Sequence, residues 1–232
     1  MIYGASTSND GDAGFCDMRL LHGSAVLSEA GMESSAENQP GSGKKQQGFV
    51  RVTGDGTSTL KLQFKNRSGS NARAGGQYII AVPLDQLDEG VDYFHVGSSA
   101  GSDELAGQGS ASWSALRNTS ALGAIPDGQY LILMSCEARF TGSGTATDAC
   151  MVRARANGAA LFPTGEVDEC WQVEWEDNTD VFCSAACGVQ PLSGGAANQL
   201  AIEVKSRGAA QTAWRRANIW LSPSRRSNYA PA

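Results

Sequence analysis

The residues of this sequence that could carry out chemistry are its six cysteines, its two histidines and a few groups of acidic side chains. The cysteines are Cys16, Cys136, Cys150, Cys170, Cys183 and Cys187. A zinc site needs Cys and His ligands at short, regular spacing, but no Cys-x-x-Cys pair occurs and both histidines lie outside the cysteine-rich half. We therefore expect neither a bound metal nor a cofactor.

Four of the cysteines are spaced as two candidate disulfides. Cys136 and Cys150 flank the Gly/Ser/Thr-rich segment 141–145, and Cys170 and Cys183 flank the polar segment 176–178. If each segment is a hairpin turn, its two cysteines become cross-strand neighbours at a separation that a disulfide can bridge. The alternative is that all six cysteines are small, buried, reduced side chains.

No catalytic constellation is evident. His22 and His95 both lie in apolar, strand-like segments, and the sequence has no nucleophile elbow, phosphate loop or dinucleotide fingerprint. Acidic residues gather at 166–169 and 176–177, and a glycosidase needs only two carboxylates on facing strands. Solvated turns account for such acidic groups equally well. We therefore expect a protein that is not an enzyme, with no catalytic residue to name.

The elements that would position these residues are short β-strands. Leu60, Leu62 and Phe64 alternate with polar residues, and a Gly-Asp-Gly turn at 54–56 separates them from the apolar segment 49–52, which predicts a hairpin. Similar runs recur along the chain between Gly-, Ser- and Asn-rich turns. One short helix is predicted over 111–122. This pattern is typical of an all-β protein, an antiparallel β-sandwich or jelly roll.

An internal similarity suggests two tandem, similar sandwiches. Residues 60–83 align without a gap on residues 200–223, at a constant offset of 140. Each copy reads as a strand, Lys-x-Arg, a long turn, a second strand and Pro. Five of the 24 aligned positions are identical, which chance resemblance between β-segments could also produce. The predicted domains are residues 1–110, with a polar N-terminal arm, and residues 111–222, with most of the cysteines; residues 223–232 form an exposed tail.

The C-terminal segment predicts a docking surface for an acidic partner. No acidic residue follows Glu203, and basic and aromatic side chains, which dominate interface hot spots, accumulate there. The alternative is a solvated strand end. The predicted docking residues are Arg207, Trp214, Arg215, Arg216, Trp220, Arg225, Arg226 and Tyr229.

Charge and hydropathy argue against two classes of partner, nucleic acids and membranes. The formal net charge of −6 repels a nucleic-acid backbone and argues against nucleic acid as a partner. Apolar runs are too short to cross a bilayer, so we expect no membrane association. The first ten residues hold neither a basic nor an apolar region, so we expect no signal peptide and synthesis in a host cytoplasm.

The Ser/Gly/Ala-rich acidic β-sequence, the missing leader and the paired strands that end at Ile79–Pro83 and Ile219–Pro223 resemble one class of proteins. They resemble jelly-roll virion structural proteins of tailed bacteriophages, such as capsid cement (decoration) proteins and tail or fibre components. The resemblance covers most of the chain but includes no diagnostic motif, so no functional residue is carried over. It implies a jelly-roll fold, a symmetric homo-oligomer, other virion proteins of the capsid or tail as partners, and location in the virion.

Three functions follow, in order of preference. The first is a non-enzymatic virion protein that acts through protein–protein interfaces. The second is a carbohydrate- or receptor-binding sandwich module, in which exposed tryptophans would grip a sugar; the candidates are Trp113, Trp171, Trp175 and Trp220. The third is a glycan hydrolase built on facing carboxylates.

Overall fold

The computed structural model describes residues 2–9, 14–34, 44–66, 72–98, 102, 104–108, 112–141, 148–162, 171–174, 181–195, 198–208 and 212–224. Every strand pairing between named strands in this part of the chain is antiparallel. The helical content described is a single 3-10 turn, Ser120–Leu122. The predicted all-β, antiparallel sandwich class is confirmed.

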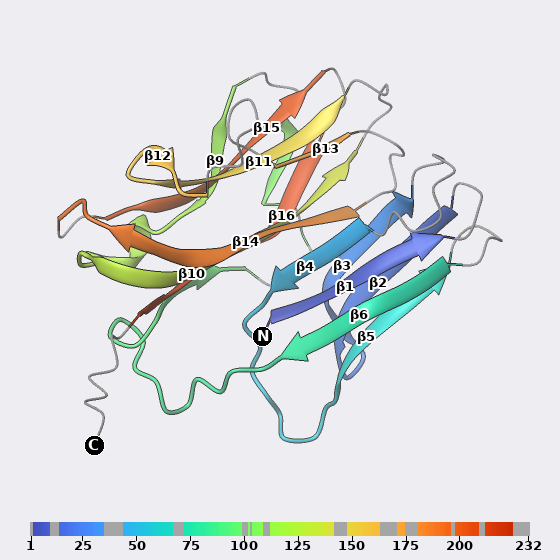
Figure 1. Ribbon diagram of the computed structural model, residues 1–232, viewed down its shortest axis with the longest axis horizontal. Coiled ribbons are helices and arrows are strands. Elements are labelled where there is room, and N and C mark those ends of the chain that lie inside the picture. Colours follow the sequence, from blue (N-terminus) through green and yellow to red (C-terminus); the bar gives the residue numbers. More distant parts are fainter. Residues whose placement is uncertain are drawn as a thin grey trace.

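The first six strands form two three-stranded sheets, which we call the N-terminal sheet pair. One sheet has the order β4-β1-β6 and the other β3-β2-β5 (Figure 1). Tyr3, Met18 and Leu20 from the two sheets are buried together between them. The strands are β1 (Ile2–Asn9), β2 (Gly14–His22), β3 (Ala25–Ser34), β4 (Lys44–Phe49), β5 (Leu60–Asn66) and β6 (Ala72–Ile80).

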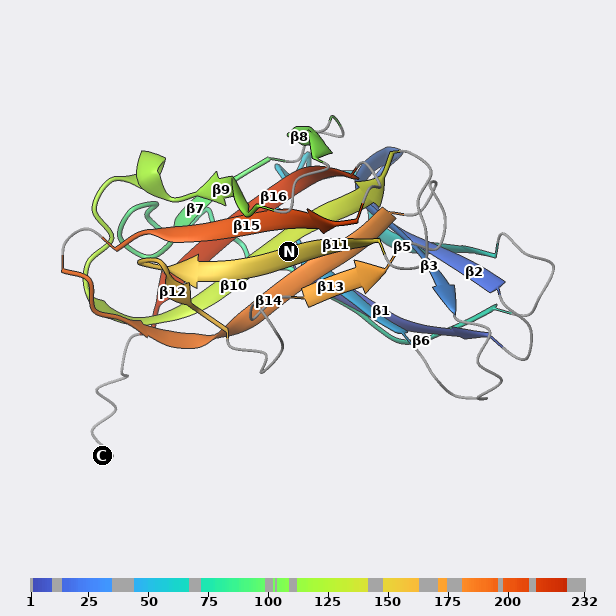
Figure 2. The same ribbon diagram turned by 90° about the horizontal axis from the view of Figure 1, so that it is seen from above.

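The remaining strands form the C-terminal sheet pair. One sheet has the order β14-β10-β16-β7 with β8 also on β16, and the other β12-β11-β15-β9 with β13 also on β11. The second sheet lies above the first in Figure 1 and in front of it in Figure 2. The strands are β7 (Phe94–Gly97), β8 (Leu105–Gln108), β9 (Ser114–Asn118), β10 (Gly128–Phe140), β11 (Ala149–Ala156), β12 (Ala159–Ala160), β13 (Trp171–Glu174), β14 (Val181–Leu192), β15 (Leu200–Arg207) and β16 (Thr212–Pro223).

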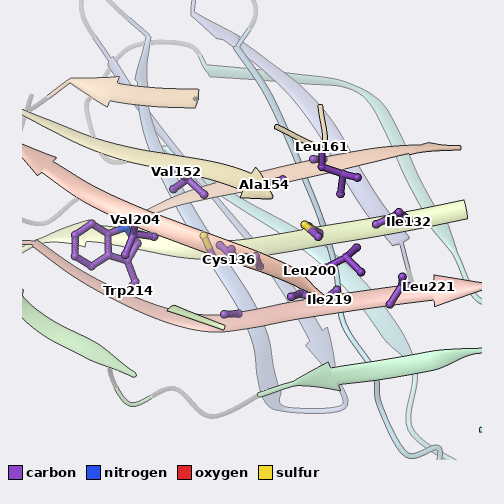
Figure 3. Packing of buried hydrophobic residues seen from close by; sticks show 14 of the residues in the cluster. Ile132, Cys136, Val152, Ala154, Leu161, Leu200, Val204, Trp214, Ile219 and Leu221 are labelled. Carbon is purple, nitrogen blue, oxygen red and sulfur yellow. The ribbon is translucent and has the colours of Figure 1, made fainter. Parts of the chain in front are cut away.

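The C-terminal core lies between these two sheets. Leu200, Ile202 and Val204 alternate inward from β15. Ile219 and Leu221 from β16 pack in the same cluster, and Figure 3 shows them with Leu200 and Val204. Each of these five side chains is at most 2% exposed. Period-two alternation thus fills the core as the sequence predicts, because successive strand side chains point to opposite faces.

The two sheet pairs share one topology. In sheet order, β14-β10-β16 matches β4-β1-β6, and β13-β11-β15 matches β3-β2-β5. Both central pairings also contain a one-residue register shift, between Gly4 and Ser6 and between Ser135 and Glu137. Gly76 and Arg216, separated by 140 residues, face these shifts with positive φ angles of 58° and 50°. The structure therefore extends the predicted similarity from two strands to six.

Two local predictions are wrong. The Gly-Asp-Gly turn at 54–56 does not close a hairpin, because β4 pairs with β1 and β5 with β2 in different sheets. The segment predicted as a helix at 111–122 contains β9 and the 3-10 turn, where β9 is held as a strand by β15. The strands β7 and β8 precede residue 110 and pair with β16 of the C-terminal sheet pair. Separate domains remain a prediction.

Candidate functional site

The most elaborate polar site in the described residues is a buried cluster around Glu137, which we call the Glu137 cluster. Glu137 lies near the C-terminal end of β10 and only 2% of it is exposed. Its Oε2 accepts hydrogen bonds from Arg215 Nε at 2.9 Å and from Arg216 Nη1 at 2.7 Å. Its Oε1 accepts one from Ser28 Oγ at 2.6 Å. Two guanidinium groups and a hydroxyl thus compensate the charge that burial would otherwise make costly.

The register shift in β16 explains why two consecutive arginines reach one carboxylate. In a regular strand, Arg215 and Arg216 would point to opposite faces. The shift lies opposite the step from Ser135 to Glu137, and Arg216 adopts the left-handed φ of 50° there. An extra residue of this kind re-aims a side chain. Both arginines therefore bind Glu137, and the two ion pairs offset the backbone strain at Arg216.

The N-terminal sheet pair supplies the other side of the cluster. Ser28, from β3, donates to Glu137, and the hydroxyl of Tyr3, from β1, is hydrogen-bonded to Ser28. Next to it, Ser135 Oγ donates to the carbonyl oxygen of Phe49 at 3.1 Å. Tyr3, Ser28 and Phe49 are all buried. The Glu137 cluster is therefore a brace that joins the two sheet pairs.

A cavity of about 10 Å³ lies within this brace, lined in part by Ser28, Ser135 and Arg216. That volume is about the size that one water molecule requires, and far below that of a small-molecule site. The buried Nε of Arg216 has no hydrogen-bond partner in the structure, so it is a donor for such a water. The arrangement fits one bridging water and not a substrate.

His95 closes one end of the brace. Its Nε2 lies 3.2 Å from Asn218 Oδ1, and its ring packs edge-on against Phe49 with centroids 6.4 Å apart. Burial lowers the pKa of His95 below its ordinary 6.5, although the hydrogen bond to Asn218 opposes that shift. With Asn218 and Phe49 as its neighbours, His95 is a packed residue, as the sequence predicts.

Three of the eight predicted docking residues, Trp214, Arg215 and Arg216, face inward in the described part of the chain. Trp214 is fully buried in the core, and Arg215 and Arg216 face Glu137, because β16 lies between β10 on one side and β7 and β8 on the other. Trp220 is half-buried and Arg207 is exposed. Arg225, Arg226 and Tyr229 lie outside the described residues.

The strands on either side of segments 141–145 and 176–178 do not pair with each other, so the predicted hairpins that would bring the cysteines together do not form. Cys136 is on β10 and Cys150 on β11, which belong to opposite sheets of the same sandwich, and both are buried. Burial raises the pKa of the Cys150 thiol far above its ordinary value, which keeps it protonated and unreactive. Cys187 is free and exposed. Cys170 lies outside the described residues, and β13 and β14, which flank 176–178, pair in different sheets.

The candidate sugar-binding tryptophans are dispersed. Trp113 is half-buried, and the guanidinium of Arg153 covers its ring at 4.0 Å from the centroid. Trp220 lies on the opposite sheet of the sandwich, on β16. The side chain of Trp171, the whole of Trp175 and the acidic groups at 166–169 and 176–177 lie outside what the structure describes. In the described part, Trp113 and Trp220 do not form one platform.

Sequence reasoning missed Glu137, although the sequence contained a signal for it. Glu137 is the one acidic residue in the apolar strand 130–140, and Arg215-Arg216 interrupts the alternation of the next-to-last apolar run. An acid in a buried strand requires a partner, and two adjacent residues of one type within an alternating run indicate a bulge. Together the two signals predict this ion cluster.

Among the residues that the structure describes, no group of three or more His, Cys, Asp or Glu side chains is placed to hold a metal ion. A search of the same residues finds no helix with the length and apolar character that crossing a membrane requires.

Comparison with known proteins assigns no family. No protein-family model matches the chain, and no curated protein matches it. Among solved structures, the infectious bursal disease virus VP2 subviral particle aligns with 96% of this chain and 56% of its own, at 10% identity and a TM-score of 0.36. The structure of the Gt strain of that virus aligns with 98% and 56%, at 10% identity and a TM-score of 0.37.

A bacterial structure scores at a similar level. Dimeric latent PorU from Porphyromonas gingivalis aligns with 95% of this chain and 24% of its own, at 9% identity and a TM-score of 0.31. The chain thus spans about half the length of the viral proteins it aligns with, and a quarter of the bacterial one.

Proposed function

We propose that this chain is a non-enzymatic structural protein of a virus particle, which stabilises a shell or an appendage through protein–protein interfaces. The observation that carries the proposal is the Glu137 cluster. Its carboxylate is saturated by Arg215, Arg216 and Ser28 and joins two sheet pairs around a cavity sized for one water. A carboxylate held in this way, beside a cavity too small for a substrate, has a structural role.

The finer assignment follows from the sequence resemblance. A cement or tail component of a tailed bacteriophage presents a rigid β-body to neighbouring subunits, and such an interface needs about 1,000 Å² or more of buried surface. The brace supplies rigidity by fixing the two sheet pairs to each other. The partners proposed are other virion proteins and further copies of this chain.

The experiment that tests this function asks whether the chain belongs to particles. Virus particles released by cells that carry the gene are purified by density-gradient centrifugation, and their proteins are quantified by mass spectrometry. We expect the chain in the particle band at a fixed stoichiometry to the main shell protein. Recovery only in the soluble fraction would overturn the proposal. A glycan array with the isolated chain is the control for a carbohydrate-binding module, and we expect no binding.

A further inference from the structure

The edge of β6 is exposed where the equivalent edge of β16 is covered. Every residue from 75 to 83 is exposed except Ile79, which is half-buried. At the equivalent positions 215–223 no residue is exposed, because β7 and β8 pair with β16. Among the described strands, β6 has only β1 as its hydrogen-bonded neighbour, and it borders its sheet on the side away from β14 (Figure 1).

This edge also lacks the charges that protect other edges. Segment 74–84 contains no charged residue, whereas the β5 edge of the facing sheet carries the exposed side chains of Lys61 and Lys65. Charged side chains, lysines in particular, keep a free edge from pairing with another chain. Three exposed apolar side chains instead follow one another at every second position, Tyr78 and Ile80 at the end of β6 and Val82 two residues beyond it.

The repeat shows which backbone groups point outward from β6. The carbonyl oxygen of Ala217 accepts from Ser98, and its N–H donates to Glu104, so both groups face away from β10. Since groups alternate along a strand, Ile219 and Leu221 face the same way, toward β7. The residues equivalent to these two are Ile79 and Ala81. Their N–H and C=O groups therefore point to the open side of β6.

We propose that this edge is an interface between two copies of the chain, in which β6 pairs antiparallel with β6 of the second copy around a two-fold axis at Ile80. Ile79 of each copy then forms a hydrogen-bonded pair with Ala81 of the other. Ile80 faces Ile80, and Tyr78 faces Val82, so the three exposed apolar side chains of each copy make one continuous cross-strand row.

Charge favours a second copy as the occupant. A two-fold axis at Ile80 places residue 76 opposite residue 84 of the other copy, and every residue from 76 to 84 is uncharged, so no like charges meet along the row. Pro83 lacks an N–H, and this ends the pairing beyond Val82. The interface rests on strand topology and stands whether or not the chain is part of a virus particle.

Sedimentation velocity of the purified full chain over a wide concentration range tests the interface. We expect a concentration-dependent dimer. Ile80→Lys places two like charges on the axis and should weaken dimerisation at least about tenfold. Ala81→Pro should do the same by removing an outward N–H, without loss to the β1–β6 ladder, whose register ends at Ile80. The matched control is Val91→Lys, at a residue that is 62% exposed and lies outside the strands, between β6 and β7, and it should leave dimerisation unchanged.

Cross-linking supplies a second readout that does not depend on affinity. In a Cys187→Ser background, Ile80→Cys should give a disulfide-linked dimer under mild oxidation, because directly opposed strand residues lie within disulfide reach. Val91→Cys should not. A chain that stays monomeric throughout, or that dimerises equally well with Ile80→Lys and Ala81→Pro while Ile80→Cys fails to cross-link, overturns the proposal. Circular dichroism confirms that each variant is folded.

Discussion

Leu62 and Ile202 occupy the same place in the two sheet pairs, 140 residues apart, yet Leu62 is half-buried and Ile202 is 2% exposed. The same difference holds for Leu60 against Leu200 and for Phe64 against Val204. The topology is shared, so strand order does not cause the difference. The C-terminal pair has β7, β8 and β9 along the edges of β16 and β15, and the N-terminal pair has no counterparts among its described strands. Edge strands, and not the shared six, decide how deeply the core is buried.

The largest effect should come from breaking the brace between the two pairs. Glu137→Ala leaves the charge of Arg216 buried without its partner, and we expect the free energy of unfolding to fall by about 3–5 kcal/mol in urea titrations. Hydrogen exchange should accelerate more in β1 and β3 than in β15, because β1 and β3 lose their link to the better-buried half.

The matched control is Glu203→Ala, which removes a less buried carboxylate that accepts from Arg153 Nε at 2.7 Å. Its cost should be about 1 kcal/mol, because this pair is only partly buried and solvent still screens it. Equal losses for the two variants would show that Glu137 does not act as a brace.

The next largest effect is the loss of stability when equivalent isoleucines of the two cores, Ile219 and Ile79, are replaced by alanine. Ile219 is fully buried, so Ile219→Ala should leave a cavity and lower the free energy of unfolding by about 2–5 kcal/mol. Ile79 is half-buried beside the open edge of β6, and Ile79→Ala should cost about 1 kcal/mol. Urea titrations of both variants give the ratio of the two losses in free energy of unfolding. A ratio near one would mean that the burial difference between the two pairs has no energetic consequence.

A smaller effect concerns the two positive-φ positions. Gly76 has a φ of 58° with open space around its Cα, so Gly76→Ala is costly only through its backbone conformation, by about 1 kcal/mol. Gly75 also has open space but no positive φ, and Gly75→Ala should change stability by less than about 0.5 kcal/mol. Thermal melts of the two variants separate the cases. If Gly76→Ala were as neutral as Gly75→Ala, the bulge in β6 would not match that at Arg216.

The smallest effect is a pH dependence of the brace. Burial lowers the pKa of His95 in the folded state, so the unfolded chain binds a proton first as the pH falls. The stabilisation is therefore complete above about 6.5, the pKa of an unperturbed His, and is lost as the pH falls toward the folded-state pKa. His95 faces Asn218 and the Phe49 ring, with Arg51 and Glu89 nearby. Urea midpoints at pH 7.5 and 5.5 should differ less in His95→Gln than in the parent chain.

These comparisons show how far the sequence could predict the molecule. Alternation at Leu60–Phe64 and Leu200–Val204 predicts strands and core, because period-two burial is a local property of the chain. Pairing partners are not local, which is why the Gly-Asp-Gly turn suggested a hairpin where the chain crosses to the facing sheet. The prediction that Arg215 and Arg216 are exposed was wrong for a related reason. A bulge turned both arginines inward, toward an acid 78 residues earlier.

The position of β16 has a consequence for synthesis on the ribosome. This strand comes last among those described, yet it lies inside its sheet, with β10 on one side and β7 and β8 on the other. A nascent chain must therefore hold more than a hundred residues of unfinished sheet until β16 emerges, whereas all six strands of the N-terminal pair are available once β6 is translated. Such long-range closure is slow, and the waiting strands are open to aggregation. Yield should therefore depend on elongation rate and chaperone supply during translation of the segment from β7 to β16.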